Sequence, residues 1–161
     1  MKAKSMLVVA AAAAAVLLAV VAAVEGQSGG TAGSVVVQPT DVKWEPARSL
    51  PAGIMASVLH GDTVKGPSAV LVKIPAGTLI PPHRHSADEI ALVHSGTILF
   101  GTGEKVDEAT AVTIPAGGYV KVSPNAAHWS KAKTDVVYVR YAPGAADVTY
   151  CNPADDPRKK P

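Results

Sequence analysis

The sequence predicts a single domain built of β-strands and arranged as a sandwich or small barrel. The first observation is a series of short β-rich runs, separated by turn residues at close and fairly even spacing. The second is that no long window has helical periodicity once the apolar N-terminal stretch is set aside. The third is a repeated tetrapeptide, Ile-Pro-Ala-Gly, at residues 74–77 and 114–117. Together these patterns are typical of an all-β fold.

The predicted strands are rich in β-branched and aromatic residues, which favour extended backbone. In chain order they cover residues 35–37, 42–44, 56–59, 69–74, 89–93, 97–100, 111–114, 119–122, 135–141 and 148–150. The polar stretch between the two halves, residues 101–109, contains glycine and is predicted to be a surface loop. A phosphate-binding loop would need a helix after it and more glycines in register.

The repeated tetrapeptide predicts two similar corners between strands. The two copies lie forty positions apart, and a proline followed two residues later by glycine suits a tight turn. The simplest interpretation is that each copy opens one half of a jelly roll. The alternative is chance reuse of a common turn sequence.

Residues 1–26 are predicted to be a signal peptide or an N-terminal membrane anchor. A short basic head with Lys2 and Lys4 precedes an uninterrupted apolar run, residues 7–24, and small residues suited to signal peptidase end near Ala23. We therefore expect export to the periplasm or the medium, with membrane association only if the segment is retained. The glycine-rich residues 27–34 are expected to be a flexible linker before a folded domain at 35–161.

Composition excludes several classes of partner and cross-link. The formal net charge is +2 and aromatic residues make up 4% of the chain, so neither a phosphate-tracking patch nor a base-stacking surface is evident. Nucleic acid is not an expected partner. The single cysteine, Cys151, cannot form an internal disulfide, so the domain is expected to fold in an oxidising compartment without one.

The residues with the most informative chemistry are His83, His85 and Glu89. They share parity, so a locally extended chain would direct all three toward one point. His128 precedes another strand-like run and is the candidate for a fourth ligand. Three imidazoles and one carboxylate suit a divalent Mn, Fe, Co, Ni or Zn ion, whereas Ca and Mg prefer more oxygen. Six-coordinate geometry would leave two positions open.

The spacing G-x5-H-x-H-x3-E-x6-G over residues 77–96 resembles the first motif of the cupins, also called RmlC-like proteins. Residues 117–132 resemble the second motif, but Ser123, Asn125 and Ala132 stand where proline, glycine and asparagine are usual. Asparagine tolerates positive φ, so Asn125 can still make the turn. The resemblance implies a double-stranded β-helix, or jelly-roll barrel, with one divalent transition metal, and leaves the substrate open.

Two side chains outside the ligand set are candidates for a catalytic role. Tyr138 and Arg140 share parity on the last long predicted strand, so both are expected to project into the barrel. A solvated sheet face gives the same alternation and is the alternative. The exposed apolar run at 35–37 is also suited to a strand-exchanged homodimer.

Two classes of function fit these observations. The first is a metal-dependent enzyme of oxygenase, lyase or isomerase type that acts on a small oxygenated molecule at the open metal positions. The second is a non-catalytic module that binds or senses a metal or small ligand. The fold and ligand set are shared by both classes, so the sequence does not decide between them.

Overall fold

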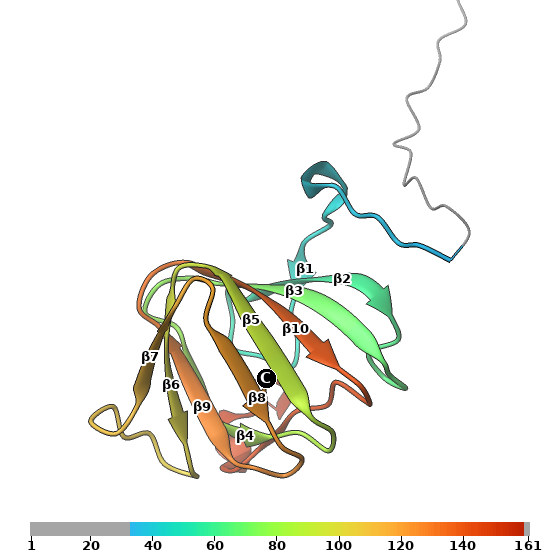
Figure 1. Cartoon of the computed structure of the whole chain (residues 1–161). Helices are drawn as coiled ribbons and strands as arrows, with labels where there is room; N and C mark the ends of the chain where they lie inside the picture. The colour runs from blue at the N-terminus through green and yellow to red at the C-terminus, as the bar shows by residue number, and fades with distance from the viewer. Residues whose placement is uncertain (1–32, 160–161) are drawn as a thin grey trace, which may run out of the picture.

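The structure is a computed structural model that describes residues 33–159, and Figure 1 shows that they form two facing β-sheets. The six-stranded sheet has the order β1-β2-β3-β10-β5-β8, and the five-stranded sheet has the order β11-β4-β9-β6-β7. All strand pairs are antiparallel, which confirms the predicted all-β jelly roll. The proposed signal or anchor segment lies outside the described residues. Within 33–159, no helix has the length and apolar character needed to cross a bilayer.

The elements are short, and three are single 3-10 turns. Their bounds are η1 Pro39–Asp41, β1 Glu45–Pro46, β2 Met55–Gly61, β3 Ser68–Ile74, β4 Leu79–Arg84, β5 Glu89–Ser95, β6 Thr97–Thr102, β7 Val112–Pro115, β8 Tyr119–Val122, β9 His128–Ala132, β10 Val136–Ala142, β11 Thr149–Tyr150, η2 Pro153–Asp155 and η3 Pro157–Lys159.

The core lies between the two sheets and follows from strict alternation on the central strands. On β3, every second residue from Ser68 to Ile74 is buried, and on β10 the same holds from Val136 to Ala142. Because side chains on a strand alternate between faces, these residues point inward and the intervening ones point to solvent. Tyr138 and Arg140 belong to the inward set, as predicted.

The two Ile-Pro-Ala-Gly segments form matching turns. Gly77 and Gly117 have φ angles of 78° and 83°, a left-handed conformation that glycine adopts without a steric penalty. In each segment the amide after the glycine donates to the proline carbonyl oxygen, at 3.2 Å in the first and 2.9 Å in the second. The first turn leads from β3 into β4, and the second leads from β7 into β8. The predicted pair of similar corners is present.

The strand predictions near the N-terminus were wrong. Residues 35–37 form no strand and are exposed, and the predicted strand at 42–44 is replaced by the two-residue strand β1 at Glu45–Pro46. Within residues 33–159 no strand pairs with 35–37, so the β preference of valine is not realised there. The predicted homodimer assumed a strand at 35–37 that could be exchanged. Without that strand the homodimer stays a prediction.

Two strands of the structure, β4 and β9, are not among the predicted strands. β4 contains Pro81 and Pro82, which cannot donate to a ladder and argue against a central strand. The structure accommodates them because the β4–β9 register shifts between Ile80 and His83. Such an irregularity is where proline is tolerated within a sheet. These two strands carry His83 and His128.

Candidate metal centre

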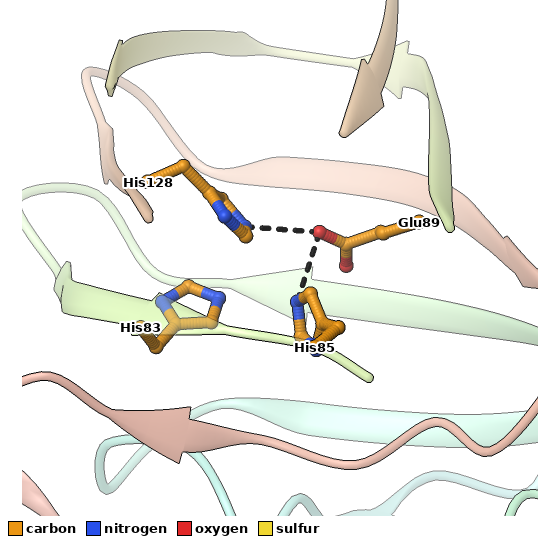
Figure 2. A group of neighbouring side chains, drawn as sticks. All are labelled: His83, His85, Glu89 and His128. Carbon is orange, nitrogen blue, oxygen red and sulfur yellow. Dashed lines mark hydrogen bonds and ion pairs between the residues drawn. The ribbon is translucent and has the colours of Figure 1, made fainter. Parts of the chain in front are cut away.

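Four side chains from three strands and one loop meet inside the barrel. His83 lies on β4, His85 follows its last residue, Glu89 begins β5 and His128 begins β9. Figure 2 shows the four side chains directed toward one another. One potential ligand atom from each lies within 4.8 Å of the others. The sequence therefore identified the right set of neighbours.

The prediction that these side chains converge because they share parity on one extended run is only partly right. His83, His85 and Glu89 do not share one extended strand, because β4 ends at Arg84 and the chain turns before β5 begins in the other sheet. The segment 85–88 forms a corner between the sheets. Glu89 faces the histidines across the barrel interior rather than from the same strand face.

His128 reaches the site as expected for a neighbouring return strand. β9 pairs with β4 in antiparallel fashion, and His83 and His128 are register partners. Their ring centroids are 4.2 Å apart. The turn before β9 is fixed by Asn125, which has φ 61° and donates its amide to the His85 carbonyl oxygen at 2.8 Å. Positive φ at this asparagine matches the prediction.

The hydrogen bonds of the imidazoles decide which ring nitrogen faces the site. Nδ1 of His83 lies 2.7 Å from the Pro81 carbonyl oxygen, and Nδ1 of His128 lies 3.2 Å from that of Ala126. Nδ1 of His85 makes a short contact with the carbonyl oxygen of Asp147. A carbonyl only accepts, so each neutral ring carries its hydrogen on Nδ1 and presents the lone pair of Nε2 to the site.

With this tautomer, hydrogen-bond acceptors face each other: the Nε2 lone pairs of the imidazoles and the carboxylate oxygen of Glu89. Oε2 of Glu89 lies 3.1 Å from Nε2 of His85 and 3.1 Å from Nε2 of His128. The angles between His85 Nε2 and the Glu89 carboxylate do not suit a hydrogen bond. This Nε2 is therefore a buried nitrogen without a hydrogen-bond partner among the described residues. Unpartnered buried polar atoms are costly and rare, and a cation between these lone pairs would remove the conflict.

The spacing of the donors also suits a transition metal. Donors at adjacent corners of an octahedron with bonds of about 2.1 Å lie about 3.0 Å apart. The two contacts of 3.1 Å between Glu89 and the histidines agree with that edge length. The donor set of three imidazoles and a carboxylate therefore fits a divalent transition metal in both chemistry and size.

Burial and neighbouring charges keep two of these groups in their ligating forms. Burial, followed by the nearby His128, lowers the pKa of His83 to about 3, so its ring is neutral near pH 7. Burial alone would raise the pKa of Glu89. The adjacent His128 and His85 rings and the charge of Arg140 outweigh that effect and hold the pKa of the Glu89 carboxyl well below its usual value. The carboxylate is therefore ionised.

The two catalytic candidates line the same cavity but differ in their contacts. Arg140 is 9% exposed, and its Nε donates to Oε1 of Glu89 at 2.7 Å. Tyr138 is 7% exposed, and burial raises the pKa of its phenol, so the hydroxyl stays protonated at neutral pH. The sequence placed both on the inner face. It gave no sign that Arg140 would pair with Glu89.

A cavity of about 260 Å³ adjoins the four side chains. Most of its wall is apolar and comes from both sheets. Among the lining residues are Val72, Val93, Ile98 and Phe100. Phe100 also stacks against His128, with ring centroids 5.7 Å apart. A cavity of this kind suits a small molecule that is apolar over most of its surface.

Sequence reasoning missed the contribution of Asp147. Its carbonyl oxygen bonds the His85 ring, while its carboxylate accepts from the backbone and hydroxyl of Ser86 at 3.0 and 2.9 Å. Asp147 is separated from His85 by 62 positions, and no motif marks it. Of the other histidines, His94 is exposed on β5 and His60 does not line the cavity.

Comparison with known proteins supports the fold. Residues 32–146 match the family model of the ChrR cupin-like domain. No curated protein sequence matches the chain significantly. The match spans the four clustered side chains and both catalytic candidates, and it ends just before Asp147.

Three solved structures that share the fold with this chain are 17–24% identical to it. An RmlC-like cupin protein from Ralstonia eutropha JMP134 is 20% identical, with 76% of this chain and 75% of that chain covered and a TM-score of 0.59. A putative acetylacetone dioxygenase from Methylibium petroleiphilum PM1 is 24% identical, with 80% and 88% covered and a TM-score of 0.61. A structure described as DMSP lyases is 17% identical, with 69% and 63% covered and a TM-score of 0.55.

Proposed function

Because this chain belongs to the ChrR cupin-like domain family, we propose that it binds one divalent transition metal and uses it to act on a small oxygenated molecule. The proposed ligands are His83, His85, Glu89 and His128. The observation that carries the proposal is the pair of 3.1 Å contacts between Glu89 Oε2 and two imidazole nitrogens that bear lone pairs. A metal of this class, when bound, supplies a Lewis acid at its remaining positions.

The protein side chains around the metal would position the substrate. The apolar wall excludes water and holds the body of a small molecule. Tyr138 keeps its proton because its pKa is raised, so its hydroxyl can donate to a substrate oxygen in the cavity. Arg140 and Glu89 form a buried ion pair, so together they add no net charge to the cavity.

The reaction is proposed to be of oxygenase, lyase or isomerase type. Structures with this fold include the putative acetylacetone dioxygenase and the DMSP lyases, so the fold accommodates both kinds of chemistry. At identities below 25% their activities do not transfer to this chain. The type of reaction is therefore a matter for measurement rather than for comparison.

A second candidate function is a module that binds a metal or small ligand without chemistry. One observation favours it. The charged side chains that line the cavity are Glu89 and Arg140, and they are paired with each other. Among the described lining residues, Tyr138 is then the acidic group left outside the ligand set, and because its pKa is raised it stays protonated and cannot act as a base at neutral pH.

One experiment tests the proposal and separates the two candidates. The metal that copurifies with the protein is measured by elemental analysis. The loaded protein is then mixed with small acids, phenols and diketones, with and without oxygen, and each compound is followed by mass spectrometry. Consumption of a compound that stops on chelation supports the enzyme. A protein that acquires no metal would overturn the metal-dependent enzyme and the metal-binding module, and would leave only a module that binds a small ligand.

We also propose that the chain is exported. The support is the basic head with Lys2 and Lys4 followed by the apolar run at 7–24. Mass spectrometry of protein from the fractionated source cell should show a mature chain that begins between Val24 and Gln27, outside the cytoplasm. An intact Met1 in the membrane fraction would instead establish the anchored form.

A further inference from the structure

The two carboxylate oxygens of Glu89 have separate roles. Oε2 faces the imidazoles of His85 and His128, at 3.1 Å from each Nε2. Oε1 accepts a hydrogen bond from Nε of Arg140 at 2.7 Å. Figure 2 shows one oxygen joined to the two rings, while the other is not joined to them. One oxygen is thus free to bind an ion, and the other is already engaged.

Arg140 is held firmly in this position. It lies on β10, which pairs with β3 on one side and β5 on the other. Its Nη1 lies 3.5 Å from the Ala146 carbonyl oxygen. The guanidinium does not lose its proton, so a move away from Glu89 would leave two buried charges without partners. That cost keeps Arg140 paired with Glu89.

A third contact of the guanidinium also holds Arg140 in place, although it is not a hydrogen bond. Nη2 of Arg140 lies 3.2 Å from Nδ1 of His85. The guanidinium only donates, and this Nδ1 already donates to the Asp147 carbonyl, which is the shorter contact. The two nitrogens are therefore in packing contact, and Arg140 fills the space beside both Glu89 and His85.

We infer that Arg140 is a positioning residue that restricts Glu89 to binding the metal through Oε2 alone. The inference rests on the proposed metal site. A carboxylate with both oxygens free can offer both to one cation. With Oε1 in a charge-assisted hydrogen bond, a second bond to the metal must first break that interaction. The chain then supplies four donor atoms, and the other positions stay available to a ligand from the cavity.

The test uses cobalt-loaded protein, because the visible bands of cobalt report its coordination. Azide and imidazole serve as probes, one anionic and one neutral at pH 8. In the wild type, each probe should change the bands with a measurable Kd. In Arg140→Met, cobalt should still bind, the probe-free bands should change, and both Kd values should rise about 10-fold or more, as is typical of outer-shell partners.

The two probes separate positioning from simple charge attraction. If Arg140 acted only through its charge, azide would bind more weakly to Arg140→Met and imidazole would bind as before. That outcome would overturn the inference. Arg140→Lys keeps the charge but not the planar fork, so it should restore azide affinity only in part. Arg48→Met, at an exposed arginine, should leave both Kd values unchanged.

A second measurement needs no variant and covers the case in which Arg140→Met does not fold. A crystal structure of the cobalt-loaded wild type should place one Glu89 oxygen on the metal and the other on Arg140. Two Glu89 oxygens on the metal would overturn the inference. Failure of the wild type to bind cobalt is a different result, because it would reject the proposed metal site itself.

Discussion

His83 and His128 face each other as register partners across β4 and β9, with their ring centroids 4.2 Å apart. The pairing joins the two sequence motifs in one sheet, so each motif supplies an imidazole to the same point. Removal of either histidine would therefore leave the proposed metal site one imidazole short.

Removal of these two histidines should abolish metal binding. His83→Ala and His128→Ala should each sharply lower the metal content, and the double variant should hold none, because too few donors remain. Elemental analysis measures the content, and His94→Ala, at an exposed histidine on β5, is the matched control. Chelation should lower the Tm of the wild type, since the metal binds only the native state. Full occupancy in the double variant would reject the ligand assignment.

Acid should destabilise the metal-free protein through His83. Its pKa is about 3 in the folded chain, against about 6.5 when unfolded. Between these values the unfolded chain binds a proton that the folded chain does not, so the free energy of unfolding falls as pH falls. The slope contributed is at most about 1.4 kcal/mol per pH unit.

The measurement is urea unfolding of chelated protein between pH 6.5 and 4.5. At the acid end of this window Glu89 in the unfolded chain also begins to take up a proton, and it does so in the wild type and in His83→Asn alike. In His83→Asn the dependence should be flatter, whereas His94→Asn should follow the wild type. Parallel curves for wild type and His83→Asn would show that His83 is not held neutral by burial.

If the protein is an enzyme, Tyr138→Phe should separate activity from metal content. The change removes one hydroxyl from the cavity wall and touches none of the proposed ligands. Metal content should hold while turnover falls about tenfold or more, as for a lost catalytic hydrogen bond. Tyr141→Phe, on the solvent side of the same strand, is the control.

The binding-module alternative makes a different prediction for the same protein. No compound would then be consumed by the metal-loaded wild type, with or without oxygen, although some ligand would raise its Tm. That pair of results would remove the catalytic proposal and keep the metal.

Gly101→Ala should destabilise the fold without touching the proposed ligands. A Cβ at this position would lie 2.2 Å from the ring of Trp129, which is 0% exposed. Overpacking of this kind costs about 1–3 kcal/mol, measured by urea unfolding. Adding Trp129→Phe should make the effect of Gly101→Ala smaller, because the smaller ring leaves room. An unchanged effect would mean that the clash is relieved elsewhere.

Parity reasoning worked where strands are regular and failed where they end. Tyr138 and Arg140 face inward because β10 alternates without interruption across their positions. For His85 and Glu89 the same reasoning assumed one extended run, whereas β4 stops at Arg84 and β5 belongs to the other sheet. The family motif placed these residues correctly because its spacing spans the corner.

Contacts made by backbone atoms leave little trace in a sequence. The carbonyl oxygens of Pro81, Ala126 and Asp147 fix the three imidazole tautomers, yet any residue type can supply a carbonyl. The ion pair between Arg140 and Glu89 joins residues 51 positions apart, so only the strand pairing reveals it. Residues 35–37 show the opposite case, in which the local preference for a strand finds no partner strand in the part of the chain that the structure describes.

The late position of Asp147 and β11 in the chain has a consequence for assembly. β11 pairs with β4 at His83, and the Asp147 carbonyl orients His85, so two of the first motif's histidines are held by residues from the C-terminal end. During synthesis the site therefore stays incomplete until residues 147–150 have emerged. If the chain is exported as proposed and crosses the membrane unfolded, the site forms only after translocation, and the ion must come from outside the cytoplasm.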